Sequence, residues 1–329
     1  AGEPTVAHLA AALARLPPGD RSGVVVVAVG GGSTIDLAKA LAALATNLPA
    51  GMAERNYETA VLDHLEGVGR GLAISRPPLP CVALPTTAGT GAEATRNAVI
   101  SCPNRRIKKS MRSPLMVPRA VIVDPDLTLS CNRATTAAAG LDCITQLIES
   151  FVCRFRRPLP RSLVLDALPR AVAAFPSVLD EPADAAARAR MSHAALLSGM
   201  ALTNSGLGMA HGVAAALGIE CGTPHGIACA LLLPVALSVN REVCEADFAM
   251  LERSIDPTAA ENDAVAAGAF TTRIEALCVL AGVPRRLAEV GLERGRIGWL
   301  AENSGGASLR GNPVELEPES LRLILEAWY

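Results

Sequence analysis

Hydrophobic residues follow two different patterns along this chain, and the change falls near residue 130. In the first part, short apolar runs rich in β-branched residues alternate with segments of helical periodicity, which predicts strands separated by helices. The expected strands are 23–29, 81–84 and 120–123, and the expected helices are 4–16 and 34–42. The run at 23–29 is continuously apolar, as in a parallel strand buried on both faces. We therefore expect an α/β domain with a mostly parallel sheet over residues 1–130.

After residue 130 the apolar positions recur with helical spacing, and no strand-like run returns. Pro176 and Pro182 are expected to break the helices in which they fall. The expected helices are 133–152, 162–179, 183–203 and 206–219. Residues 131–329 are thus predicted to form an all-helical domain, which makes this a two-domain protein of 329 residues.

Charge and composition exclude several classes of function. The net charge is −2, and no cluster of Lys and Arg is interleaved with aromatic residues, so we expect no nucleic-acid partner. The densest basic run, 105–109, is interpreted as a solvated turn or an anion contact. No apolar run reaches the ~18–20 residues of a membrane helix, and the N-terminus lacks the plan of a secretory signal. Nine cysteines without a CxxC pair indicate a reducing, cytoplasmic location.

Two glycine-rich loops follow predicted strands. Gly30–Ser33 lies between a strand and a helix, where bare backbone N–H groups and a helix N-terminus attract phosphate. It matches neither GxGxxG nor a Walker loop, so a structural turn is the alternative. Residues 86–91 (TTAGTG) also follow a strand, at the end where open α/β sheets bind ligands. This loop offers hydroxyls and amides to a diphosphate or ribose, or is simply solvated.

Two of the five histidines, His211 and His225, lie in a nearly uncharged, apolar segment. A buried imidazole needs a polar partner, and neutral imidazole is the commonest metal ligand. The two residues are too far apart for one helical turn, so a bend at Thr223-Pro224 is expected to bring them together. Two hydrogen-bonded core histidines are the alternative interpretation.

A third constellation lies in the segment GLDCITQLIES. Asp142 and Gln146 are four residues apart on one helix face, and Glu149 broadly follows the same face. Asp142 is a candidate third metal ligand, or only a charge at a helix start. Cys143 and Cys221 lie near the candidate site and are further candidate ligands, although nothing there resembles a zinc-type cysteine pair.

These motifs, in this order, resemble the iron-containing (group III) alcohol dehydrogenase family, within the dehydroquinate synthase-like fold. The resemblance rests on VVAVGGGSTIDLAKALA, LPTTAGTGAEATRNAVI, RSPLMVPRAVIVDPDLT, GLDCITQLIESF, GLGMAHGVAAALG, TPHGIACALLLP and SLRGNPVELEPESLRLILEA, which span nearly the whole chain. The family usually has further strands and a helix before the segment at which this sequence begins.

The resemblance implies a role for each matching position. Cofactor binding would involve Gly31, Gly32, Ser33, Asp36, Thr86, Thr87, Thr90 and Lys109, the last of these at a ribose hydroxyl. Asp142, His211 and His225 would be both catalytic residues and metal ligands, and Gln146 would stand in the place of the fourth ligand. The family carries histidine at this fourth place, and an amide oxygen is a poorer ligand for Fe²⁺ or Zn²⁺. Ala215 stands where many members carry a further histidine.

The implied activity is metal-assisted interconversion of an alcohol and an aldehyde or ketone, by hydride transfer to or from NAD(H) or NADP(H). The metal would be Fe²⁺ or Zn²⁺, the substrate a small alcohol or aldehyde, and the protein a cytoplasmic homodimer without a nucleic-acid or membrane partner. Two alternatives remain: a metal-dependent lyase of the dehydroquinate synthase type, or a catalytically degraded homologue that acts as a binding or assembly partner.

Overall fold

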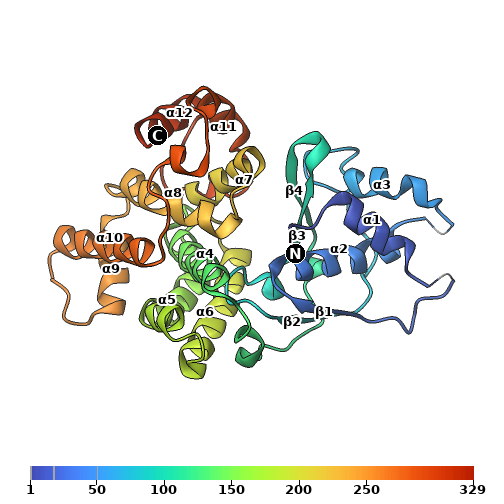
Figure 1. Cartoon of the computed structure of the whole chain (residues 1–329), viewed down its shortest axis with the longest axis horizontal. Coiled ribbons are helices and arrows are strands. Elements are labelled where there is room, and N and C mark those ends of the chain that lie inside the picture. The colour runs from blue at the N-terminus through green and yellow to red at the C-terminus, as the bar shows by residue number, and fades with distance from the viewer. Residues whose placement is uncertain (1, 18, 50) are drawn as a thin grey trace. The chain divides into compact units, whose positions relative to one another are not determined.

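The structure, a computed structural model, describes residues 2–17, 19–49 and 51–329 (Figure 1). These residues divide into two compact units. The sheet unit comprises the described residues up to Thr87 together with Gly91–Thr128, and the helical unit comprises Ala88–Thr90 and Leu129–Tyr329.

The sheet unit is built on three parallel strands in the order β1-β2-β5. Its elements are α1 Val6–Ala14, β1 Val26–Gly30, α2 Gly32–Asn47, α3 Tyr57–Asp63, β2 Cys81–Pro85, β3 Asn97–Cys102, β4 Ile107–Arg112 and β5 Ala120–Val121. The parallel sheet and its three strands were predicted from the sequence and are confirmed. Gly30 pairs with Pro85 at the carboxyl ends of β1 and β2, so the two glycine-rich loops leave the sheet side by side.

One prediction about the sheet is wrong. Strand β1 is not buried on both faces: Ala28 is 1% exposed, whereas Val27 and Val29 are 59% and 56% exposed. The buried side of the strand packs with Ile35 and Ala38 of α2. A continuous apolar run is compatible with burial on both faces of a strand. It does not determine whether helices pack on one face of the sheet or on both.

The sheet unit also contains a hairpin that the sequence analysis missed. Strands β3 and β4 pair antiparallel, from Asn97 opposite Arg112 to Cys102 opposite Ile107. The turn between them includes Arg106 in the left-handed region, so the basic run at 105–109 is part turn and part strand. Only Ala98 and Ile100 of β3 are buried, and so short an alternation is a weak signal of a strand.

Residues 129–329, all of which the structure describes, contain helices and no strand, as predicted. The helices are α4 Arg133–Val152, α5 Pro158–Asp180, α6 Ala185–Asn204, α7 Met209–Cys221, α8 His225–Asn240, α9 Glu245–Ile255, α10 Asp263–Leu280, α11 Ile297–Asn303 and α12 Pro318–Ala327. Helices α4, α5 and α6 pack side by side, and α8 packs against α4 and α7.

Helix α5 corrects two expectations. It runs through Pro176 without a break, because Phe175 and Val178 on either side are buried in the core and this packing outweighs the lost backbone hydrogen bond. It is also long and apolar enough to cross a membrane by length and composition. This is weak evidence for a membrane segment, since buried core helices pass the same test and half of this stretch is buried inside the protein.

The expected bend between the two histidines is present. Helix α7 ends at Cys221, Gly222 adopts the left-handed region with φ of 69°, and α8 begins at His225 directly after Pro224. One residue into α8, Gly226 lies against the backbone of α4: a Cβ there would be 2.1 Å from the Ala138 carbonyl oxygen. This close approach fixes the first turn of α8 next to α4.

We predict that Gly226→Ala destabilises the protein by about 3 kcal/mol or more, since overpacking of a core costs about 1–3 kcal/mol even where side chains can move, and here the obstacle is backbone. The free energy of unfolding would be measured by urea denaturation. Gly268→Ala in α10 is the matched control, because its Cβ would meet only Arg241 at 3.9 Å. The control should be neutral or stabilising by up to about 1 kcal/mol. Equal stability of the two variants would contradict the close α4–α8 contact.

Candidate functional site

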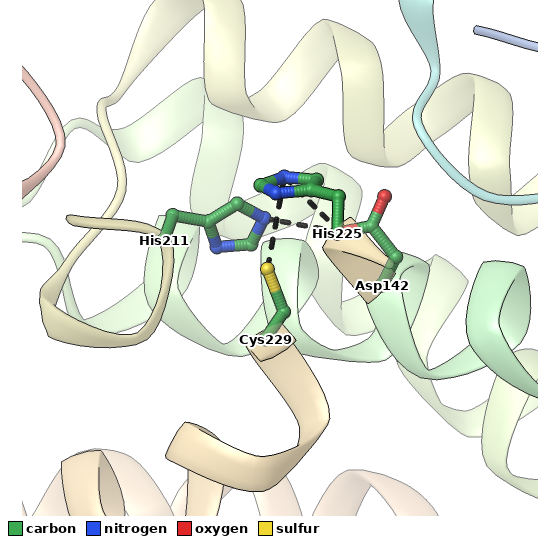
Figure 2. Close-up of side chains that lie close together, drawn as sticks. All are labelled: Asp142, His211, His225 and Cys229. Carbon is green, nitrogen blue, oxygen red and sulfur yellow. Dashed lines mark hydrogen bonds and ion pairs between the residues drawn. The ribbon is translucent and has the colours of Figure 1, made fainter. Parts of the chain in front are cut away.

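Four side chains from three helices of the helical unit converge on one point (Figure 2). Asp142 comes from α4, His211 from α7, and His225 and Cys229 from α8. One ligand atom from each lies within 4.8 Å of all the others. The convergence of Asp142, His211 and His225 was expected and is confirmed, whereas the sequence analysis did not identify Cys229.

The distances define a compact cluster. The His211 Nε2 lies 3.2 Å from the Asp142 Oδ1, and the His225 Nε2 lies 4.0 Å from the same oxygen. The Cys229 Sγ lies 3.7 Å from the His225 Nε2. Asp142, His211 and Cys229 are buried, whereas the His225 side chain is 31% exposed. The cluster is therefore enclosed on most sides and accessible at His225.

Glu149 holds His211 from the other side of the ring. Its Oε2 lies 2.7 Å from the His211 Nδ1, and its Oε1 accepts a hydrogen bond of 2.7 Å from the Ala210 N–H. This buried carboxylate thus also satisfies the N-terminus of α7, where a negative charge is favourable. Gly208 makes room for it, since a Cβ there would be 2.9 Å from the Glu149 Oε1. A carboxylate behind a histidine fixes the tautomer that leaves Nε2 free to bind a metal.

Glu149 was expected on this face of α4, but without a role. The available signal was its position seven residues after Asp142, which is two helical turns. For Cys229 the signal was its position four residues after His225, which puts both on one face of α8. Cys143 and Cys221 were candidate ligands only because they lie near the motifs in sequence. Cys143 is buried in the hydrophobic core, and Cys221 is the last residue of α7.

Gln146 is buried beside the cluster, with both ends of its amide engaged. Its Nε2 donates to the Asp142 Oδ2 at 3.2 Å, and its Oε1 accepts from the Ser198 hydroxyl at 3.0 Å. A carboxylate only accepts hydrogen bonds, so the amide nitrogen must be the end that faces Asp142. Gln146 therefore orients Asp142 so that the other carboxylate oxygen, Oδ1, faces the histidines.

The pKa values of the cluster reflect its burial and its crowded charges. Burial opposes ionisation of Asp142, but the hydrogen bond from His211 and the charges of both imidazoles outweigh it and lower the pKa of the carboxyl. Burial likewise opposes a charge on His211, but Cys229 and Asp142 beside it raise its pKa well above the usual range. Burial raises the pKa of the Cys229 thiol to about 11.

These groups fit a divalent cation. Asp142 and Glu149 are buried carboxylates, and such groups need positive charge beside them, either a proton on His211 or a metal ion. Ligand atoms around a tetrahedral ion with bonds of about 2.0–2.3 Å are roughly 3.3–3.7 Å apart. The three distances of 3.2, 3.7 and 4.0 Å in the cluster bracket this spacing. Nitrogen, oxygen and sulfur donors of this kind suit Fe²⁺ or Zn²⁺.

The predicted phosphate loop lies in the sheet unit. Gly31 is the N-cap of α2, and the helix begins at Gly32. The N–H groups of Gly32 and Ser33 therefore lie in its first turn. The neighbouring loop touches it: the Thr86 N–H donates to the Gly30 carbonyl at 3.0 Å, and a Cβ on Gly31 would be 3.2 Å from the Thr87 side chain. The two loops expected to bind cofactor are therefore adjacent.

The other expected cofactor residues have surroundings of their own. The Asp36 carboxylate pairs with Lys39 at 3.1 Å and accepts from the Val99 N–H at 2.9 Å, so both of its oxygens are engaged within the sheet unit. Lys109 is exposed on β4. Thr90 belongs to the helical unit. The structure thus brings Gly31, Gly32, Ser33, Thr86 and Thr87 together, and gives Asp36 a structural contact as well.

The sheet unit carries a nucleotide-type loop at the end of a parallel strand, and the helical unit carries an Asp/His/His/Cys cluster that could hold a metal ion, a combination that fits a metal-dependent oxidoreductase. Two family models match nearly all of the chain: "Iron-containing alcohol dehydrogenase" matches residues 1–125, and "Fe-containing alcohol dehydrogenase family, C-terminal" matches residues 136–329. The chain belongs to the iron-containing alcohol dehydrogenase family, and the resemblance seen in the sequence is confirmed.

Relatives agree with this assignment. The chain is 33% identical to the probable alcohol dehydrogenase EutG of Escherichia coli (strain K12), over 95% of this chain and 74% of the relative. It is 31% identical to the lactaldehyde reductase of Escherichia coli (strain K12), over 92% of this chain and 76% of the relative. The crystal structure of sulfoacetaldehyde reductase from Bifidobacterium kashiwanohense, in complex with NAD⁺, matches with a TM-score of 0.83 and 28% identity, over 100% of this chain and 81% of that one.

The fold and the relatives together identify an oxidoreductase of the alcohol dehydrogenase type, which interconverts alcohols and aldehydes or ketones. The expected fold, an α/β sheet domain followed by a helical domain, is that of this family.

The position of Glu149 leads to a prediction about metal binding. The two Glu149 oxygens accept from the His211 ring and from the Ala210 N–H. In Glu149→Gln one of these oxygens is replaced by an NH₂ group, which donates and does not accept, so one of the two contacts is lost. We expect Zn²⁺ affinity to fall about 10–100-fold, as for other partners of metal-bound histidines. Competition with a chromophoric chelator would measure it. An unchanged affinity would show that Glu149 serves α7 alone.

Proposed function

We propose that this chain is an NAD(P)-dependent, metal-assisted alcohol dehydrogenase or carbonyl reductase that acts on a small alcohol or aldehyde. The observation that carries the proposal is the convergence of Asp142, His211 and His225, with Glu149 behind one imidazole. A neutral core histidine has a single N–H and needs one acceptor, whereas His211 has a buried carboxylate at each ring nitrogen, which suits a ring that also faces a cation. The relatives named as alcohol dehydrogenase and lactaldehyde reductase support the substrate class.

Asp142, His211 and His225 would hold the divalent ion, Fe²⁺ or Zn²⁺. The ion would supply Lewis acidity to the oxygen of the reacting alcohol or carbonyl group. Glu149 holds the His211 ring so that Nε2 faces Asp142, and Gln146 holds Asp142 by its second oxygen. Gln146 was expected as a fourth ligand, and its contacts support a positioning role instead. The exposed side of His225 is where a substrate would reach the cluster.

The dinucleotide would bind at the adjacent loops of the sheet unit. The N–H groups at the start of α2, at Gly32 and Ser33, suit a diphosphate, since a helix N-terminus favours negative charge. Gly31 leaves space beside Thr87, and Thr86 and Thr87 offer hydroxyls. Asp36, Thr90 and Lys109 stay in the proposal as further contacts, with Lys109 at a ribose hydroxyl. NAD⁺ in the complex of the sulfoacetaldehyde reductase supports a nicotinamide cofactor here.

We also propose a cytoplasmic location and a homodimer. The nine cysteines, all among the described residues, form no disulfide, which suits a reducing compartment. The degraded-homologue alternative was motivated by Gln146 and Ala215. The intact arrangement of Asp142, His211 and His225 favours a working site. Elemental analysis together with an NADH titration of the purified protein separates the two: metal and cofactor binding support the dehydrogenase, and the absence of both supports the degraded homologue.

His211→Ala should abolish turnover while NADH affinity stays within about twofold, because the metal cluster and the glycine loops belong to different units. Activity would be followed by NADH absorbance with a set of short-chain alcohols and aldehydes. His193→Ala is the control, since this exposed histidine on α6 pairs with the exposed Asp166 and does not belong to the metal cluster. A melting curve for each variant is needed. Loss of NADH binding together with a collapsed melting curve would mean that His211 is a core residue.

Gly31→Val should weaken NADH binding at least about tenfold and leave the metal content unchanged. Its side chain would enter the space beside Thr87, where a Cβ alone already lies at 3.2 Å, and would occupy the approach to the first turn of α2. Fluorescence titration with NADH and elemental analysis of the same sample would measure both effects. Undiminished NADH affinity would place the dinucleotide elsewhere.

A further inference from the structure

We propose that Cys229 is the fourth ligand of the metal centre, and that the resulting Asp/His/His/Cys set binds Zn²⁺ in preference to Fe²⁺. The inference rests on the proposed function, because it concerns the ion held by Asp142, His211 and His225. It assigns to this chain a sulfur donor in place of the amide oxygen expected from Gln146.

The first argument is the position of Cys229. It lies one helical turn after His225 on α8, so its side chain is on the same face of the helix. Figure 2 shows the thiol pointing into the space between the two imidazoles and Asp142. Its Sγ lies 3.7 Å from the His225 Nε2 and within 4.8 Å of the donor atoms of Asp142 and His211. Cys229 itself is fully buried, so its sulfur faces these donors and not solvent.

The second argument is what Gln146 does with its amide. The end that faces Asp142 is the nitrogen, which has no lone pair to offer a metal, and the oxygen accepts from Ser198 on α6. Turning the oxygen toward the ion would break both hydrogen bonds in a buried environment. Cys229 needs no such rearrangement, since its sulfur already lies at ligand-to-ligand distance from the His225 nitrogen.

The third argument is charge and donor softness. When the ion binds, the Cys229 thiol releases its proton to solvent and the thiolate sulfur donates a lone pair to the metal. Thiolate and the Asp142 carboxylate then place two negative charges against the divalent cation, while the Glu149 carboxylate accepts from the His211 Nδ1–H behind the cluster. A soft thiolate beside imidazoles favours Zn²⁺, and Zn²⁺ also exceeds Fe²⁺ in the general affinity order for such donors.

Cobalt(II) provides a readout that does not depend on activity. The full chain would be stripped of metal with a chelator and loaded with Co²⁺ under anaerobic conditions. A sulfur ligand produces a thiolate-to-cobalt charge-transfer band in the near ultraviolet, and the visible ligand-field bands report that cobalt is bound in any case. We expect both in the parent protein.

Three variants sharpen the test. Cys229→Ser should keep the ligand-field bands, lose the charge-transfer band and bind Zn²⁺ at least about tenfold more weakly. Cys221→Ser, at the end of α7, is the matched control and should retain the charge-transfer band. Gln146→Ala should retain it as well, because Gln146 is not the sulfur donor. Equimolar Fe²⁺ and Zn²⁺, offered anaerobically and counted by elemental analysis, should load mainly Zn²⁺ into the parent and a lower ratio of Zn²⁺ to Fe²⁺ into Cys229→Ser.

The outcomes separate this inference from the proposed function. Ligand-field bands without a charge-transfer band in the parent would leave the metal centre in place and overturn Cys229 as a ligand. Persistence of the charge-transfer band in Cys229→Ser would overturn it too. Failure of the parent to bind any Co²⁺ or Zn²⁺ would instead overturn the metal centre, and the proposed function with it. If Cys229→Ser does not fold, the parent spectrum alone decides whether sulfur binds the metal.

Discussion

A buried imidazole between two buried carboxylates is the constraint on which the helical unit depends. Asp142 and Glu149 lie two turns apart on α4, and His211 of α7 bridges them through its two ring nitrogens. Glu149 also accepts from the Ala210 N–H, so one carboxylate both caps the N-terminus of α7 and fixes the His211 ring. Burying these charges is unfavourable unless each one has a partner, so the start of α7 and the orientation of the site are determined together.

Small residues allow the helices to come close enough for this arrangement. Gly208 leaves room for the Glu149 carboxylate, and Gly226 lets α8 approach the α4 backbone at Ala138. The second contact directly follows His225, so the packing of two helix backbones sets where the imidazole lies. Cys229, one turn later, reaches the same point from the same helix. The geometry of the donors is therefore a consequence of core packing, and a mobile loop supplies none of them.

Much of the fold could be predicted from the sequence. The β-branched runs predicted the three parallel strands, and the helical periodicity after residue 130 predicted α4 to α7 and the all-helical character of the residues that follow. The bend at Pro224 followed from the restriction that proline places on its neighbour. The exposure of Val27, the hairpin of β3 and β4, and the continuity of α5 through Pro176 were not predicted. Each depends on what packs against a segment, and local pattern carries no information about that.

The site divides in the same way. By itself the sequence determined the family, the glycine loops and three converging residues, Asp142, His211 and His225, because rare polar residues in apolar segments and a recognisable motif order are properties of the chain alone. Only the tertiary structure decided that Glu149 stands behind His211, that Gln146 turns its nitrogen to Asp142, and that Cys229 faces the cluster. The physical reason is that helical spacing fixes which residues share a face, whereas the partner of that face is fixed by how closely α4, α7 and α8 pack.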